Sequence, residues 1–228
     1  MKVASQQSRD GGFYEFDRQF RKSDLVKIPG VLPEEIGNWR GIVYSGTPWV
    51  PIDFVNMYSC VLESSSESED KQGYDEIKDT VQCLVDAGYK AGYESFYLAK
   101  VSDKNSQWHL GKKFGFLSWS MSFSVQTPYS MTVCHMDHNF ELVNGEKVRR
   151  GGFLKDYLNR KILIAVEDWK PGQAFCLGTQ VWKNWKAGDA VILKNAMPHY
   201  GHNFTEHDRI FLMISGVVTQ EWCEKYGC

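Results

Sequence analysis

The C-terminal half of the chain is divided into short apolar segments, each followed by a turn signal. The segments 161–166, 174–177 and 190–193 are rich in aliphatic residues, and Pro171-Gly172 and Gly188-Asp189 lie between them. Short runs bounded by glycine, proline and aspartate are typical of antiparallel strands, whereas strands alternating with long helices are typical of a parallel sheet. The pattern therefore predicts a mainly β protein whose core is an antiparallel sandwich or barrel.

The N-terminal half is predicted to support this core. We expect a short helix over 33–36, an amphipathic helix over 74–93 that packs on the outside of a sheet, and a solvated loop over the acidic, serine-rich residues 63–73. Further strands are expected over 25–32, 94–101, 114–125, 129–135, 181–185 and 210–216. With 43% hydrophobic residues and no evident linker, the chain is predicted to be one globular domain over 1–228, with a core at about 110–220 and supporting elements in 1–109.

The triplet His135-Met136-Asp137 follows the strand predicted over 129–135. In an extended chain, side chains at i and i+2 point to the same face, so His135 and Asp137 could bind one metal ion together. A surface hydrogen bond between them is the simpler alternative. His138 could replace Asp137 as a ligand only if the strand were broken, because it faces the other side, and zinc bound through Cys134 lacks a second cysteine pair.

A third candidate ligand follows downstream, together with a cation. His199 comes after Pro198 at the end of a predicted strand, and Arg209 is ten residues further on. Two histidines and one carboxylate can occupy one face of a ferrous ion and leave three positions open. His202 and His207 are rivals of His199, and His202 could also lie beside a substrate or on the surface. Arg209 could instead pair on the surface with Asp208 or Glu206.

Taken together, His135-x-Asp137, Gly188-Asp189 before a strand, and His199 with Arg209 ten residues later resemble the Fe(II)/2-oxoglutarate-dependent dioxygenases. The segment from Trp185 to Arg209 is similar to the distal half of the prolyl-hydroxylase-like members. The resemblance covers roughly residues 110–220. It implies a double-stranded β-helix, also called a jelly roll or cupin-like fold, with flanking helices.

The resemblance also implies a site and a reaction. His135, Asp137 and His199 would be the iron ligands, Arg209 would bind the distal carboxylate of 2-oxoglutarate, and Thr132 stands where many members have a tyrosine that contacts the same co-substrate. With O2, the enzyme would convert 2-oxoglutarate to succinate and CO2 while hydroxylating a C–H bond. The substrate would be a small molecule, an amino acid or a peptide side chain.

Three alternatives remain open at this point. A cupin-like metalloenzyme would not need Arg209, and a non-catalytic β-helix module would bind without turnover. Nucleic-acid demethylases of the same superfamily have a second arginine six residues after the first, where this chain has Ser215. The net charge of −2 gives no reason to expect a nucleic-acid partner.

The sequence also sets expectations about location and cysteines. No apolar run is long enough for a membrane helix and the first residues lack a hydrophobic signal core, so a cytoplasmic protein is expected. The six cysteines contain no CxxC pair and are expected to be reduced thiols. The oligomeric state is not predicted.

Overall fold

The computed structural model describes several segments of the chain, separated by gaps. They are residues 25–46, 82–91, 95–132, 159–177, 180–194 and 199–227, with the short paired segments 6–7, 13–14, 48–49, 140–143 and 146–149. His135, Asp137, His138, Cys134 and the loop 63–73 lie outside the described residues.

The larger sheet has seven strands in the order β3-β14-β11-β16-β7-β6-β4, and every pair in it is antiparallel. Its strands are β3 (Leu25–Ile28), β14 (Ala190–Lys194), β11 (Asn159–Ala165), β16 (Arg209–Val217), β7 (Ser118–Gln126), β6 (Phe96–Val101) and β4 (Pro48–Trp49). The nine-residue strands β16 and β7 pair along their whole length, with Arg209 opposite Gln126.

The smaller sheet has five strands in the order β13-β12-β15-β8-β5. Its strands are β13 (Gln180–Trp182), β12 (Gln173–Leu177), β15 (His199–Asn203), β8 (Ser130–Met131) and β5 (Lys90–Ala91). All of its pairs are antiparallel except β5 with β8. Two hairpins stand apart from these sheets, β1 (Gln6–Gln7) with β2 (Phe13–Tyr14) and β9 (Phe140–Val143) with β10 (Glu146–Arg149).

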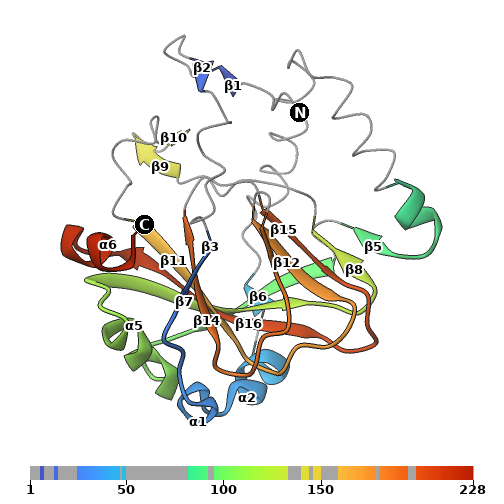
Figure 1. The fold of residues 1–228 in the computed structure, drawn as a ribbon, viewed down its shortest axis with the longest axis horizontal. Coiled ribbons are helices and arrows are strands. Elements are labelled where there is room, and N and C mark those ends of the chain that lie inside the picture. Colours follow the sequence, from blue (N-terminus) through green and yellow to red (C-terminus); the bar gives the residue numbers. More distant parts are fainter. Residues whose placement is uncertain are drawn as a thin grey trace.

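Alternation along the strands divides the interior into two cores. On β16, Ile210, Leu212 and Ile214 belong to one cluster, whereas Phe211 belongs to the other. The second cluster joins the two sheets, because it also contains Phe175 from β12 and Trp182 from β13. The sheets therefore face one another across a shared core (Figure 1), and this arrangement is the predicted jelly roll.

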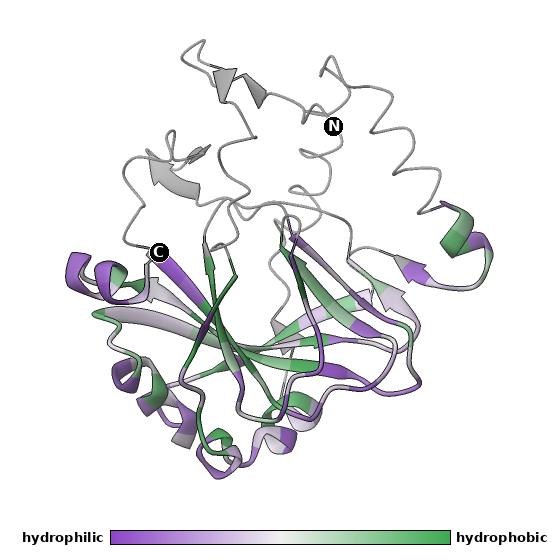
Figure 2. Ribbon diagram, viewed as in Figure 1, coloured by the Kyte–Doolittle hydropathy of each residue, from purple (hydrophilic) through white to green (hydrophobic). Residues whose placement is uncertain are grey.

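Short helices cover the outer face of the larger sheet. They are α1 (Pro33–Ile36), α2 (Trp39–Ser45), α5 (His109–Lys113) and α6 (Gln220–Tyr226), with a 3-10 turn at Ser106–Trp108. Ile36, Val43, Leu110 and Trp222 extend from them into the first cluster. In Figure 2 the hydrophobic colour concentrates on the strands, while the helices also carry hydrophilic residues. Burial of apolar side chains on both faces makes the larger sheet the centre of the fold.

Most of the predicted strands are confirmed, and the differences are local. The helix predicted over 74–93 extends too far at its C-terminal end, since residues 82–86 are helical but Gly88 has a φ of +92° and β5 begins at Lys90. Residues 74–81 of that prediction lie outside the described residues. Its predicted apolar residue Val85 is 41% exposed. Part of the strand predicted over 114–125 is a turn after α5, and β15 was not predicted.

Two further observations concern location and cysteines. Within the described part of the chain, no helix has the length and apolar character that crossing a membrane would require. The described cysteines Cys83, Cys176 and Cys223 are not joined to one another by disulfides.

Candidate functional site

Strand β15 presents three residues to the interior between the sheets. His199, Gly201 and Asn203 are buried, whereas Tyr200 and His202 between them are only half-buried. His199 therefore points inward, as a metal ligand must, and is 9% exposed. His202 faces the other way, and its ring stacks on Phe204 with centroids 4.6 Å apart.

Arg209 reaches the same interior from the larger sheet. It is 5% exposed, and its guanidinium carbon lies 5.0 Å from the centre of the Phe211 ring and 5.9 Å from that of Phe175. Nη1 donates to the carbonyl oxygen of Ala174 on β12, and Nε has no hydrogen-bond partner among the described residues. Asp208, which could have paired with it on the surface, instead accepts a hydrogen bond of 3.0 Å from the Tyr44 hydroxyl.

A buried cation of this kind fits a carboxylate ligand. None of the described ion pairs includes Arg209, so no described Asp or Glu neutralises it. Burial lowers the pKa of Arg209 to about 9, and the guanidinium is still charged at pH 7. Burial and the nearby Arg209 also lower the pKa of His202. A buried charge without a partner costs free energy, which an anionic ligand can recover through charge-assisted hydrogen bonds.

Gly201 makes room for the guanidinium. A Cβ added there would lie 2.3 Å from Nη2 of Arg209, so no larger residue fits without moving the arginine. The glycine backbone is held on both sides. Its N–H donates to the Thr132 hydroxyl at 2.7 Å, and its carbonyl accepts from the Thr132 N–H at 2.8 Å and from Nε2 of Gln126 at 2.9 Å. In the described structure the Thr132 hydroxyl thus contacts Gly201, and its predicted contact with 2-oxoglutarate stays a prediction.

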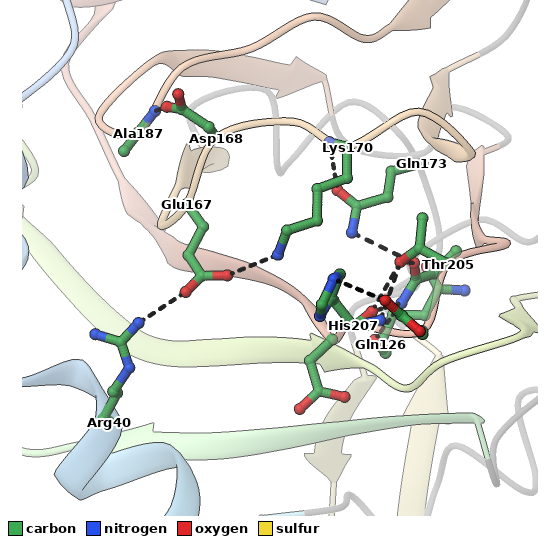
Figure 3. A network of polar contacts seen from close by, with 12 residues as sticks. Arg40, Gln126, Glu167, Asp168, Lys170, Gln173, Ala187, Thr205 and His207 are labelled. Carbon is green, nitrogen blue, oxygen red and sulfur yellow. Dashed lines mark hydrogen bonds and ion pairs between the residues drawn. The ribbon is translucent and has the colours of Figure 1, made fainter.

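Asn203 is the next inward-facing residue of β15 after Gly201. It is fully buried, and its Nδ2 donates to the carbonyls of Gln126 at 3.0 Å and His207 at 2.7 Å. Its Oδ1 accepts from Gln173 at 3.3 Å and from Thr205 at 2.7 Å. Figure 3 shows Gln126, Gln173, Thr205 and His207 converging at this point. The amide network ties β7, β12 and β15 together, so the strands around Arg209 are fixed relative to one another.

His199 and Arg209 are linked through one aromatic ring. The Phe175 ring lies 5.8 Å from the His199 ring and 5.9 Å from the Arg209 guanidinium carbon, measured to the ring centre. Within the described segments no group of three His, Cys, Asp or Glu side chains forms a metal site. His135 and Asp137 lie outside those segments. The buried imidazole of His199 is compatible with one metal ligand, and the other two ligands remain predictions from the sequence.

A surface cleft of about 410 Å³ beside α2 is a separate feature. Its charged groups pair with one another, since Glu167 binds Arg40 at 2.9 Å and Lys170 at 3.3 Å (Figure 3). Because these charges are already paired near water, the cleft lacks the unneutralised, buried charge found at Arg209.

Replacing Gly201 with alanine should disturb the Arg209 position directly. The added methyl group would overlap the guanidinium, so we expect a loss of about 1–3 kcal/mol of stability and roughly 10- to 100-fold weaker binding of the predicted co-substrate 2-oxoglutarate. Thermal unfolding and calorimetric titration measure the two effects. Gly41→Ala, on exposed α2 and near only the Asn38 side chain, should change neither by a comparable amount. Unchanged binding in Gly201→Ala would contradict the placement of Arg209.

Sequence reasoning did not identify Phe175, Gly201, Asn203 or Gln126. The available signal was the period of two in His199-Tyr-Gly-His-Asn203, which places Gly201 and Asn203 on the face of His199 once that segment is taken as a strand. Gln126 and Phe175 become neighbours of Arg209 only through strand pairing and sheet packing. No local motif indicates such contacts.

Comparisons with known proteins leave both the family and the activity of this chain open. No family model matches the chain, and no curated protein matches it by sequence. Solved structures that match part of this chain include the cupin domain of Schizosaccharomyces pombe Cnp3 (7% identity, TM-score 0.33, covering 58% of this chain and 72% of that one). A predicted oxalate decarboxylase from Thermotoga maritima has 12% identity and a TM-score of 0.33, covering 54% and 81%. A salicylate 1,2-dioxygenase mutant from Pseudoaminobacter salicylatoxidans has 12% identity and a TM-score of 0.32, covering 63% and 34%. At such TM-scores and identities, none of these likenesses supports an inference about the family, the activity or the substrate of this chain.

Proposed function

We propose that this chain is an Fe(II)- and 2-oxoglutarate-dependent oxygenase that hydroxylates a C–H bond of a small molecule, an amino acid or a peptide side chain. The observation that carries the proposal is Arg209, a buried guanidinium without a described carboxylate partner, on the interior side of the jelly roll that His199 also faces. A jelly-roll protein that binds no anion would gain nothing from a buried cation at this position, because the cation is costly to desolvate.

The spacing of the interior residues suits a dicarboxylate. His199 and Gly201 are successive inward residues of β15, roughly 7 Å apart along an extended strand, and Gly201 contacts the Arg209 guanidinium. A ligand anchored at Arg209 and reaching a metal at His199 must therefore carry a carboxylate at one end and chelating oxygens a few carbons away. 2-Oxoglutarate has this form, whereas a monocarboxylate satisfies only one end.

The chain's own residues would bind the co-substrate, orient it and exclude water from it. The guanidinium presents a planar pair of donors, which matches the two oxygens of a carboxylate. Phe175 and Phe211 place aromatic rings beside that group, and the hydrogen bonds of Asn203 fix the neighbouring strand β7. His135, Asp137 and His199 would hold the iron, which supplies the oxygen-activating chemistry when bound.

The experiment that tests the function is succinate formation. The protein is incubated with Fe(II), ascorbate, O2 and 2-oxoglutarate, with and without pools of amino acids, peptides and small metabolites. We expect slow succinate release without substrate and faster release with the pool that contains it. Omission of iron and exclusion of O2 are the controls. No succinate above these controls, with any pool, would contradict the proposed function.

A further inference from the structure

The neighbour of Arg209 across the β7–β16 ladder is an uncharged amide. Gln126 is directly opposite Arg209 in the register, on the same inward face of the sheet, and is 1% exposed. Side chains at directly paired positions of an antiparallel sheet are in contact distance, with Cβ atoms roughly 5 Å apart. Gln126 therefore occupies the position from which a carboxylate could neutralise Arg209, but its own side chain is uncharged.

The amide of Gln126 is fixed in orientation. Its Nε2 donates to the carbonyl of Gly201 at 2.9 Å and to that of Ser130 at 3.3 Å. Only the NH2 end can donate to carbonyls, so Oε1 must point elsewhere. Among the described residues, Oε1 has no hydrogen-bond partner, and neither has Nε of Arg209. Within the described structure, a buried acceptor and a buried donor are thus left unpaired on two residues that face each other across the β7–β16 ladder. Such unpaired groups are unusual in a folded interior.

We propose that Gln126 determines the specificity of the Arg209 site for an anion from solution. Because the amide occupies the adjoining position without a negative charge, the guanidinium stays uncompensated until a carboxylate binds. A glutamate at this position would supply the counter-charge from within the chain and compete with the ligand. The inference rests on the proposed function, since it takes the carboxylate end of the co-substrate as the ligand of Arg209.

Two substitutions distinguish the effect of an added negative charge from the effect of losing the hydrogen bonds of the Gln126 amide. Gln126→Glu and Gln126→Met both remove the amide donors to Gly201 and Ser130, but only the first adds a carboxylate. We expect Gln126→Glu to weaken binding of 2-oxoglutarate by about 30-fold or more, because a buried charge pair with the ligand is lost. Gln126→Met should weaken it only a few-fold. The readout is the shift in thermal unfolding temperature with 2-oxoglutarate and Mn(II), without turnover. Gln220→Glu, on the exposed surface of α6, is the control for added charge.

A second measurement follows the unliganded protein. Gln126→Glu should lower the stability of the protein less when Arg209 is present than in an Arg209→Met background, because Arg209 supplies a counter-charge for the introduced carboxylate. If the glutamate variant does not fold, Gln126→Asp and Gln126→Asn form a shorter pair with the same expectation. The side chains of that pair are one methylene shorter, so the carboxylate lies farther from the carbonyl oxygens of Gly201 and Ser130.

The outcomes are distinguishable. Equal weakening by the charged and neutral members of a pair, or binding by Gln126→Glu within about threefold of wild type, would overturn the role of Gln126 while leaving the proposed function intact. Absence of any 2-oxoglutarate-dependent shift in the wild-type protein would overturn the proposed function itself, and with it the inference.

Discussion

Arg209→Ala is expected to raise the dissociation constant of 2-oxoglutarate by roughly 30-fold to several thousand-fold. In the proposed site the substitution would remove a charge-assisted pair in a desolvated interior, worth about 2–5 kcal/mol. Arg209→Lys should recover only part of the loss, because one ammonium group cannot reproduce the planar pair of donors. Anaerobic titration with Fe(II), followed by the metal-to-ligand absorption band, measures the affinity directly.

The matched control is Arg40→Ala. Arg40 has a largely exposed side chain and pairs with Glu167 at 2.9 Å, so its loss should leave 2-oxoglutarate binding unchanged. Metal content should be the same in Arg209→Ala as in wild type, because the arginine is not a ligand. Equal affinities in wild type and Arg209→Ala would remove the co-substrate from this site and leave a jelly-roll protein of unknown chemistry.

Asp137→Ala is expected to abolish substrate-dependent succinate formation. The carboxylate is the predicted third ligand beside His135 and His199, and a site with two histidines alone should hold iron less tightly and in a different geometry. Succinate assays and metal analysis of the same preparation separate loss of metal from loss of turnover.

Asp103→Ala is a suitable control for this variant, since Asp103 is exposed in the turn after β6. Its turnover and metal content should match those of the wild-type protein. Full turnover in Asp137→Ala would show that the carboxylate ligand lies elsewhere in the chain.

The strand content could be predicted because it depends on short-range patterns. Ala190–Lys194 and Arg209–Val217 are apolar runs bounded by turn residues, and both form strands of the larger sheet. The end of the supporting helix was predicted too late because its apolar spacing continues past Gly88, whose positive φ of +92° ends the helix earlier. Strand β15 was missed because its inward residues are His199, Gly201 and Asn203, none of which is a typical strand former.

For the site, the sequence by itself determined the chemistry-bearing residues that could be proposed, namely His135, Asp137, His199 and Arg209. The spacing within each of the pairs His135-x-Asp137 and His199–Arg209 is local, and the set resembles a known family. Only the tertiary structure decided the surroundings of Arg209. Its burial, its contact with Gly201, its ring neighbours Phe175 and Phe211, and its pairing opposite Gln126 all depend on strand register and on the packing of two sheets. These contacts join residues up to 83 positions apart, Arg209 and Gln126, and neither composition nor periodicity fixes which residues meet at that range.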